Sequence, residues 1–321
     1  MILRLLIRRL LLAVPLVLAV VTLTFFMVRL APGDPAVILA GESPSPAFLA
    51  QVRAEYGLDQ PLWWQFVAYL RKAATGDFGT SIYFRRPVFA VIWERFPATA
   101  LLTGSAMVVA SFAGIGLGVA AARRAGTRAD TAISAATLVG YSVPGFWIGQ
   151  LLVMFFAVQL DWLPASGMTA ARASHTGLAH VADVAAHLVL PMTTLAVFLL
   201  TMIARFTRAA MVDALGQDFV LVARAKGAGA GRVIWHHAFR NAVVTTVTVI
   251  GLEFGAVLAG AVVTEIVFGW PGLGRVFYDA INRRDFPLLT GSFIFSAVIV
   301  IAVNTISDVA CALLDPRIRR R

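Results

Sequence analysis

The stretch TRAAMVDALGQDFVLVARAKGAGAGRVIWHHAFRNA, from Thr207 to Ala242, decides the fold, because it is basic, helical in pattern and flanked by two runs too apolar for water. A polar segment between apolar runs of this length is a loop at a membrane surface. Its pattern predicts two short helices separated by glycines. We expect this loop, residues 205–240, to present a docking surface to a soluble partner in the cytoplasm.

The composition indicates that the rest of the chain lies in a bilayer. Hydrophobic residues make up 59% of the 321 positions and charged residues 14%, and the mean hydropathy is +0.82. Soluble domains are about 45–50% apolar and about 25% charged. A helix needs about 20 apolar residues to cross the hydrocarbon core. The sequence predicts an all-α membrane protein with six transmembrane helices, over the runs Leu10–Val28, Phe96–Ala122, Thr131–Leu160, Val184–Ala204, Asn241–Thr264 and Phe286–Ser307.

The net charge of +10 is distributed unevenly along the chain. Lysine and arginine gather before the first run, in 123–128, in 205–240 and at the C-terminus, which all lie on one side of the membrane in a six-span topology. Cytoplasmic segments carry such an excess of positive charge. The distribution therefore predicts cytoplasmic N- and C-termini and argues against a nucleic-acid partner. The first run is longer than the apolar part of a signal peptide, so we expect a retained span.

Residues 31–95 have the pattern of a small helical insertion outside the membrane. Ser45 can cap a helix that starts at Pro46, and Gly57 can end it in the left-handed conformation. A second short helix is expected from near Pro61. Its apolar, partly aromatic face comprises Trp63, Phe66, Val67 and Leu70. Such a face is typical of an anchor at the lipid headgroups, and a contact for an extracytoplasmic partner is the alternative.

The cytoplasmic loop itself divides into two predicted helices. Asp218 is expected to cap a helix that runs through Lys226, and Gly227 is expected to end it. A second helix is expected from about Arg232 to Phe239. The glycines between them do not form a dinucleotide-binding turn, because no strand precedes them and the spacing G-x-G-x-x-G is not met.

The chain has no motif that would supply its own energy or catalyse a reaction. Neither of its two lysines, Lys72 and Lys226, follows a glycine, so the phosphate-binding motif G-x-x-x-x-G-K-[ST] is absent. The motifs H-E-x-x-H and G-x-S-x-G are absent as well. The single cysteine, Cys311, excludes an internal disulfide. A further set of polar side chains shares one helix face: His180, Asp183 and His187. There we expect a polar patch at the membrane surface in preference to a metal site.

Three acids lie in or beside the apolar runs. Glu253 falls near the middle of the fifth run, where a carboxylate is costly and is by default a candidate for a pathway or an ion site. Glu265 and Asp308 fall near the ends of their runs, where capping or pairing is expected. Pro144 and Pro191 remove backbone donors and predict bent or loosened helices in the third and fourth spans.

Several short motifs follow one another in a fixed order. In the loop they are Ala223-Arg224-Ala225-Lys226-Gly227, then His237 and Arg240-Asn241. Elsewhere they are Pro32-Gly33-Asp34-Pro35, Gly57-Leu58-Asp59-Gln60-Pro61, Gly76-Asp77-Phe78-Gly79-Thr80-Ser81, Leu163-Pro164-Ala165-Ser166-Gly167, Glu265-Ile266-Val267-Phe268, Pro271-Gly272-Leu273-Gly274 and Asp315-Pro316-Arg317. Together they resemble the B-type permease subunits of ATP-binding-cassette (ABC) importers of the dipeptide/oligopeptide class. The resemblance covers nearly the whole chain, and the order and spacing of the motifs are very specific.

The resemblance implies the type I ABC importer permease fold and a subunit that is not an enzyme. It implies as partners a second homologous permease, two cytoplasmic ATPase subunits, an extracytoplasmic solute-binding protein and membrane lipid. ATP and Mg would be bound by the ATPase subunits, and this chain would hold no cofactor. The short helix before the matched glycine would fit a cleft of the ATPase. The implied coupling residues are Asp218, Ala223, Arg224, Ala225, Lys226 and Gly227, and the pathway candidates are Glu253 and Pro144.

The predicted organisation divides the chain into segments in the inner membrane of a prokaryote. These are a cytoplasmic N-terminus 1–9, a first transmembrane helix 10–30, an extracytoplasmic segment 31–95, a permease core 96–314 and a cytoplasmic tail 315–321. The expected function is import of dipeptides, oligopeptides or similar solutes. Nickel or glutathione import within the same family is one alternative, and an ion-coupled carrier that uses Glu253 is another. An intramembrane enzyme is disfavoured, since no nucleophile–base pair or metal cluster is recognisable.

Overall fold

The structure of the chain, a computed structural model, describes residues 2–30, 36–37, 45–55, 57–170 and 176–314. In this part of the chain the regular elements are helices, and the β-type pairing is one isolated bridge between Thr80 and Pro87. The prediction of an all-α protein is confirmed. The motifs at 32–35 and 315–317 and the predicted tail 315–321 lie outside the described residues.

Among the residues that the structure describes, four uninterrupted helices are long and apolar enough to cross a membrane. They are α1 (Ile2–Leu30), α5 (Val88–Ala122), α8 (Leu178–Leu215) and α13 (Phe286–Leu314). At about 1.5 Å per residue, each is longer than the ~30 Å hydrocarbon core. Both α5 and α8 begin before the apolar runs that predicted them, so their first turns extend beyond the predicted spans.

The third predicted span is broken in the middle. Its parts are α6 (Arg128–Ser142), α7 (Gly145–Leu152) and the π-helix η1 (Val153–Gln159), which continues α7. The axes of the two parts differ by 100°. The break follows from Pro144, because the residue before a proline avoids the helical region. Val143 accordingly has an extended backbone, with φ −83° and ψ 130°. The bend predicted at Pro144 is confirmed.

The fifth predicted span is α11 (Phe239–Val267), whose axis turns by 60° between Gly255 and Gly260. When each bent pair is counted as one span, the described chain has six spans, the number that the sequence predicts. Pro191 differs from Pro144, since it lies inside the uninterrupted helix α8 and does not break the fourth span.

Glycines bring two pairs of spans close together. A Cβ atom added at Gly118 of α5 would lie 2.6 Å from the carbonyl oxygen of Ala204 in α8, and Gly114 is similarly crowded by α8. In α11, a Cβ atom at Gly251 would collide with the side chain of Ser307 in α13. Small residues at such points let helix backbones approach each other in membrane bundles. These glycines therefore set the spacing of the bundle.

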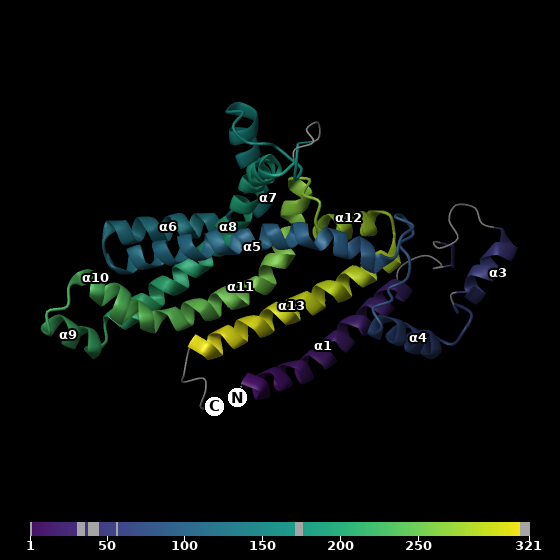
Figure 1. The fold of residues 1–321 in the computed structure, drawn as a ribbon, viewed down its shortest axis with the longest axis horizontal. Coiled ribbons are helices and arrows are strands. Elements are labelled where there is room, and N and C mark those ends of the chain that lie inside the picture. Colours follow the sequence, from purple (N-terminus) through teal and green to yellow (C-terminus); the bar gives the residue numbers. More distant parts are fainter. Residues whose placement is uncertain (1, 31–35, 38–44, 56, 171–175, 315–321) are drawn as a thin grey trace.

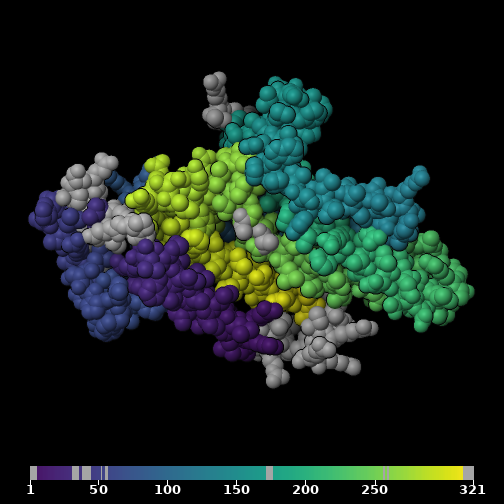
Figure 2. Space-filling view, turned by 180° about the vertical axis from the view of Figure 1, so that it is seen from behind, coloured from purple at the N-terminus to yellow at the C-terminus, as the bar shows by residue number. Residues whose placement is uncertain are grey.

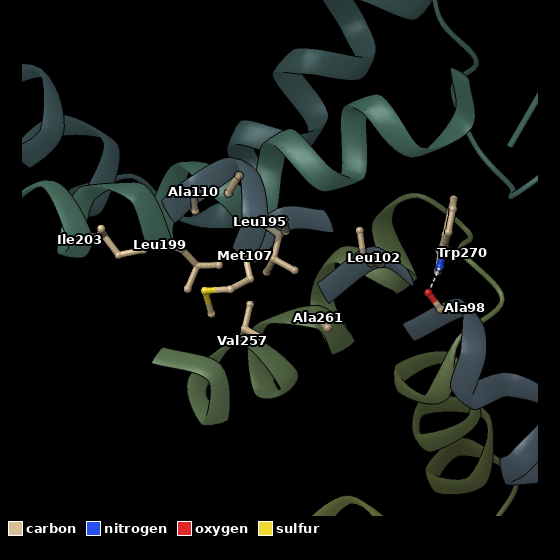
Figure 3. Packing of buried hydrophobic residues seen from close by; sticks show 12 residues of the cluster. Ala98, Leu102, Met107, Ala110, Leu195, Leu199, Ile203, Val257, Ala261 and Trp270 are labelled. Carbon is tan, nitrogen blue, oxygen red and sulfur yellow. Dashed lines mark hydrogen bonds between the residues drawn. The ribbon is translucent and has the colours of Figure 1, made fainter. Parts of the chain in front are cut away.

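The main core lies between α5, α8 and α11 (Figure 3). Met107 of α5, Leu199 of α8 and Val257 of α11 are buried in it. At one end of this core, Trp270 is fully buried and donates its indole N–H to the carbonyl oxygen of Ala98 over 2.8 Å. A buried indole N–H without an acceptor would be costly, so this bond fixes how the chain after α11 meets α5.

Two short helices follow α1: α3 (Pro46–Glu55) and α4 (Leu62–Ala74). The predicted cap of α3 is confirmed, since the Phe48 amide donates to Ser45 Oγ over 3.2 Å. Gly57, with φ +62°, lies in the left-handed region just after this helix, as predicted. Helix α4 packs on α1 through Phe66, whose ring centroid lies 5.2 Å from that of Phe25. Phe66 of the predicted aromatic face therefore packs against the first span, whereas Trp63 and Val67 of that face are exposed.

The spans separate two ends of the molecule (Figure 1). At one end lie α9 (Asp218–Ala225) and α10 (Ala230–Arg232), and at the other lie α3, α4 and α12 (Leu273–Asn282). Helix α7 projects from the bundle as an arm. Figure 2 shows α1, in purple, on the surface beside α13, in yellow, in agreement with the contacts between these helices. The predicted docking loop and the insertion after α1 are thus at opposite ends.

Candidate partner-docking site

The candidate site is helix α9, which follows α8 after a tight turn. Gln217 has an extended backbone, with φ −82° and ψ 152°, and directs the chain into α9 at Asp218. Gln217 is therefore the N-cap, and its side chain makes no capping hydrogen bond. The prediction that Asp218 caps this helix is wrong. Asp218 is the first helical residue instead, where its negative charge interacts favourably with the positive end of the helix dipole.

Gly227 ends α9 as the sequence predicts. Its φ is +83°, in the left-handed region. The amide of Ala228 donates to the carbonyl oxygen of Ala223 over 3.0 Å, and the amide of Gly227 donates to that of Arg224 over 2.9 Å. This pair of bonds closes a helix C-terminus around a left-handed residue. A Cβ atom at Gly227 would have open space around it, so the glycine serves the backbone conformation and not packing.

The second loop helix, predicted over 232–239, is not a separate element. After α10 the chain forms the π-helix η2 (Val233–Ala238) and continues without a break into α11. The physical reason is that neither glycine nor proline occurs between Phe239 and Ile250 to stop the helix. Asn241 Nδ2 donates to the carbonyl oxygen of His237 over 2.8 Å within this continuous stretch. The loop is therefore mounted directly on the fifth span.

Helix α9 buries one face and exposes an apolar one. Val220 and Ala223, three residues apart, are buried, and α9 contacts the π-helix η2. Leu221 is 72% exposed and Val222 is 50% exposed, with Phe219 also exposed beside them. Apolar side chains gathered on the surface of a polar loop indicate a contact with another protein. The basic composition of the loop predicts charged contacts with a partner. The structure adds an apolar contact face that the composition does not predict.

The predicted coupling residues all lie on α9 and its C-terminal cap. Arg224 and Lys226 are exposed, and neither forms an ion pair with another described residue. Asp218 and Ala225 are exposed as well, whereas Ala223 is buried. The two cations lie at the C-terminal end of the helix, where they interact favourably with its dipole. The result is an apolar surface with a positively charged rim.

A small core lies beneath the loop and joins four elements. We name it the loop core; its buried members are Val119, Ala122, Met211, Ala214, Ile234, Ala238 and Ala242. They come from the ends of α5 and α8, from η2 and from the start of α11. Met211 and Ala238 have no exposed surface. Because close-packed cores transmit displacement, a movement of the loop is passed to these spans.

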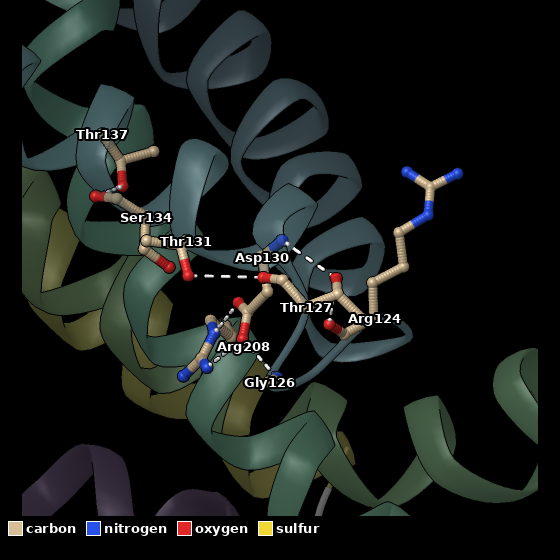
Figure 4. A network of polar contacts seen from close by, with 8 residues as sticks. All are labelled: Arg124, Gly126, Thr127, Asp130, Thr131, Ser134, Thr137 and Arg208. Carbon is tan, nitrogen blue, oxygen red and sulfur yellow. Dashed lines mark hydrogen bonds and ion pairs between the residues drawn. The ribbon is translucent and has the colours of Figure 1, made fainter.

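A second support is an ion pair between α6 and α8 (Figure 4). Arg208 donates from Nε and Nη2 to the two carboxylate oxygens of Asp130, each over 2.6 Å. The Gly126 amide donates to the same carboxylate over 3.0 Å. Bidentate arginine–carboxylate pairs of this kind are strong and specific in geometry. The pair ties the turn between α5 and α6 to α8, one turn before Met211 of the loop core.

The sequence contains a local signal for one half of this pair. Thr127-Arg128-Ala129-Asp130 fits the pattern [ST]-x-x-[DE] that precedes an apolar helix. The Thr127 side chain accepts a hydrogen bond from the Asp130 amide over 3.4 Å, as this pattern predicts. Arg208 is 78 residues away from Asp130, so no local pattern could have paired the two.

The two pathway candidates lie on separate elements. Pro144 is exposed at the break between α6 and α7. Glu253 is half-buried in α11, and no hydrogen bond or ion pair links it to another described residue. It lies two residues from both Gly251 and Gly255, which face α13, so helical periodicity places it on the side of α11 turned away from α13. An unpaired carboxylate in a span suits a wet cavity or a shared interior.

The other acids near the membrane ends have partners, as the sequence predicts. Glu265 is fully buried and accepts hydrogen bonds from Thr99 Oγ1 and the Gly274 amide, both over 2.6 Å. The carboxylate thereby caps the N-terminus of α12. Asp308 of α13 pairs with Arg9 of α1 over 2.6 Å. Both acids thus hold elements together.

The predicted polar patch at the start of α8 makes structural contacts. Asp183 Oδ2 accepts a hydrogen bond from the Ala170 amide over 2.9 Å, and His187 Nδ1 lies 3.2 Å from Asp183 Oδ1. These bonds tie the segment before α8 to its first turns. In the described part of the chain, no group of three potential metal-ligating side chains comes together.

Comparisons with known sequences cover nearly the whole chain. The family described as binding-protein-dependent transport system inner membrane component matches residues 114–320, and its N-terminal counterpart matches residues 2–103. The chain is 40% identical to the dipeptide transport system permease protein DppB of Escherichia coli (strain K12), with 99% of both chains covered. It is 40% identical to the di/tripeptide transport system permease protein DppB of Pseudomonas aeruginosa (strain UCBPP-PA14), with 98% of each covered. It is 39% identical to the glutathione transport system permease protein GsiC of Salmonella choleraesuis (strain SC-B67), with 97% of each covered.

Solved structures share the fold. An inward-facing conformation of the MetNI methionine ABC transporter matches with a TM-score of 0.51 at 15% identity, covering 71% of this chain and 96% of that chain. An amino acid ABC transporter with histidines matches with a TM-score of 0.50 at 15% identity, covering 71% and 94%. The fold is the type I ABC importer permease fold that the sequence predicted. With family matches over both halves and relatives at 40% identity over its full length, the chain belongs to the binding-protein-dependent transport system inner membrane components, the permeases of ABC importers.

Proposed function

We propose that this chain is the permease subunit of an ABC importer for short peptides and that soluble ATPase subunits drive it through α9. The observation that carries the proposal is the exposed apolar face of α9, which lies beside the closely packed loop core. Leu221 and Val222 would enter a cleft of the ATPase, and Arg224 and Lys226 would make polar contacts at the rim. The ATPase subunits would bind ATP and Mg, and this chain would supply the pathway.

The coupling is mechanical in this proposal. When two ATPase subunits close around nucleotide, each moves the helix that it holds. Here α9 is joined through η2 and the loop core to α5, α8 and α11, and the Arg208–Asp130 pair extends the connection to α6. A displacement at α9 therefore rocks several spans together. Rocking of this kind opens a pathway to alternate sides of the membrane.

The substrate class follows from the relatives and is part of the proposal. The similar permeases are named for dipeptides, di/tripeptides and glutathione, which are all short peptides. The family name adds dependence on a binding protein, which would deliver the peptide to the end that carries α3, α4 and α12. Competition of dipeptide, tripeptide and glutathione for uptake by the assembled transporter separates these substrates.

A second permease and a defined orientation complete the proposal. The arm formed by α7 and η1 exposes Trp147 and Phe155, and Trp162 in the segment that follows is exposed as well, which supports a contact outside this chain. The basic residues near α9 support a cytoplasmic location for that end and for both termini. Pro144, at the break, and Glu253, unpaired in α11, are the proposed pathway residues. Their positions would face the interior shared by the two permeases.

The test is a charge placed in the α9 contact face. Leu221→Asp changes an exposed side chain without entering the loop core, so the variant should insert and unfold like the unchanged protein. We expect it to lose co-purification with the ATPase and ATP-dependent uptake of a dipeptide. The matched control is Leu178→Asp, because Leu178 is 88% exposed at the first residue of α8, at its opposite end. Leu178→Asp should retain the ATPase. Normal ATPase binding and uptake by Leu221→Asp would refute the assignment of α9.

A further inference from the structure

A cavity of about 560 Å³ opens at the end of the molecule that carries α3 and α4. Its walls come from the last turns of α1, the turn between α3 and α4, helix α4, residues 77–80 and the first turns of α13. Most of the lining is apolar, including Phe25, Val28, Trp64, Phe78, Phe286 and Pro287. Sites for small molecules in proteins are about 300–1,000 Å³ in volume. Neither the docking site nor the proposed pathway residues take part in this cavity.

The walls of the cavity are fixed by hydrogen bonds. Gln65 Nε2 of α4 donates to the carbonyl oxygens of Leu58 and Gln60, over 3.2 and 2.7 Å, which holds the turn between α3 and α4. On the other side, Ser81 Oγ donates to Asp285 Oδ2 over 2.5 Å and anchors the segment before α5 to the start of α13. The cavity is therefore preformed, which lowers the entropy cost of binding a ligand.

Two cations and one acid line the cavity. Arg29, at the end of α1, and Lys72, on α4, line it, and neither forms an ion pair with another described residue. Arg29 is half-buried, with its guanidinium carbon 5.4 Å from the centroid of the Phe25 ring. Asp77 also lines the cavity and accepts a hydrogen bond from the Gly79 amide over 3.0 Å, so the two cations exceed the single acid in the lining. Because a partly buried charge without a partner is costly, the cavity is suited to an anionic group.

We expect the cavity to lie where the headgroups of a bilayer meet its hydrocarbon. Helices α1 and α13 are spans, and the cavity is formed by their adjoining ends. Beside it, α4 exposes 58% of Trp63 and 51% of Trp64, whose rings stack 4.2 Å apart. Tryptophans and basic residues on a short helix are typical of the membrane interface. An apolar interior and a cationic rim thus come together at the surface of the membrane.

We propose that this cavity binds an anionic phospholipid from the leaflet beside α4. One acyl chain fills the apolar interior, and the phosphate group lies between Arg29 and Lys72, which can donate charge-assisted hydrogen bonds to it. A peptide is a poorer match, because its ammonium group would meet two cations and one acid that is already hydrogen-bonded. The site is separate from the proposed import function, and neither depends on the other.

The experiment measures lipid bound to the purified full chain by native mass spectrometry. The protein is extracted from membranes that contain equal amounts of phosphatidylglycerol and phosphatidylethanolamine. The double variant Arg29→Gln/Lys72→Gln removes both charged donors to the phosphate, so retention of phosphatidylglycerol should fall at least about tenfold. Ala68→Trp, which fills the cavity from α4, should reduce it as strongly. The matched control is Arg71→Gln, because Arg71 is exposed beside Lys72 but does not line the cavity.

The outcomes separate the proposal from its alternatives. Selective retention of phosphatidylglycerol, lost in the double variant and in Ala68→Trp but kept in Arg71→Gln, supports the site. Equal retention of both lipids, or equal loss in all three variants, overturns it. Displacement of the lipid by millimolar dipeptide would also overturn it, since that would make the cavity a peptide site. Thermal unfolding in detergent checks that each variant is folded, and Ala68→Trp keeps the test valid should the double variant unfold.

Discussion

At the scale of the single residue, Glu265 joins parts of the chain that are far apart in sequence. Its carboxylate accepts hydrogen bonds from Thr99 of α5 and from the backbone at the start of α12. Thr99 Oγ1 in turn accepts from the Leu273 amide over 2.8 Å. A Cβ atom at Gly272 would collide with the Glu265 carboxylate, so the glycine and the acid form one unit. This unit fixes α12 against the first half of α5.

Glu265→Gln should destabilise the protein while keeping the size of the side chain. The amide nitrogen would face groups that donate hydrogen bonds, so at least one buried donor loses its acceptor. We expect the free energy of unfolding to fall by roughly 1–3 kcal/mol. Thermal unfolding of the purified full chain measures the change. Glu94→Gln is the control, because Glu94 pairs with Arg86 on the surface and surface pairs contribute little. Equal destabilisation by both variants would contradict the capping role.

Gly227→Ala tests whether the left-handed residue after α9 is needed. An alanine at φ +83° is strained by roughly 1–2 kcal/mol, although the side chain itself has open space. We expect α9 to fray, with weaker ATPase binding and slower ATP-dependent uptake. Gly229→Ala is the matched control, since Gly229 also has open space but has φ −65°, which alanine adopts readily. Loss of ATPase binding in Gly229→Ala alone would contradict this reading of the turn.

Single residues also show where sequence patterns stop. Gly227 could be predicted, because only its local backbone conformation matters. The cap of α9 was placed at Asp218, one residue too late, since a polar residue at a helix start is compatible with either position. The positions of Glu265 and Asp308 near the ends of their apolar runs correctly predicted that each acid caps a helix or pairs with another group. Their partners, Thr99 and Arg9, could not be predicted, because they lie on other helices.

At the scale of the element, the pair between Asp130 and Arg208 should act as a link between α6 and the coupling end of α8. Asp130→Asn removes the charge and the bidentate geometry, so we expect a lower apparent Tm and slower ATP-dependent uptake at unchanged ATPase binding. Arg124→Gln is the control, because Figure 4 shows the Arg124 guanidinium directed away from the pair. Unchanged uptake in Asp130→Asn would show that the ion pair does not contribute to transport.

The sequence predicts that the membrane helices exist, because hydropathy is a local property. It predicts only some of the positions at which these helices break. Pro144 breaks the third span and Pro191 leaves the fourth intact, although both remove a backbone donor. Helix α8 is packed along its length against α5, which holds it helical through the proline. The second loop helix was predicted as separate because glycines precede it, yet nothing follows it to stop the helix. The short helix α12 was not predicted, because its cap, Glu265, lies in the preceding span.

At the scale of the whole molecule, the chain is a bundle with α9 at one end, α4 and its cavity at the other, and an arm at its side. Its core joins α5, α8 and α11, and the loop core continues this packing to α9. The family resemblance could be recognised from the order of the motifs, and the comparisons confirm it. The apolar face of α9 and the cavity beside α4 could be found only from the structure, because both depend on how the fold arranges side chains from distant parts of the chain. Together these features support the proposal that partner subunits move this chain.

Reconstitution of the purified chain in proteoliposomes tests this dependence most directly. Uptake of a labelled dipeptide against its gradient is measured with the chain alone, and then with the second permease, the ATPase subunits and the binding protein added. We expect no uphill uptake by the chain alone, with or without an ion gradient, and ATP-dependent uptake by the complete assembly. Uphill uptake by the chain alone would contradict it.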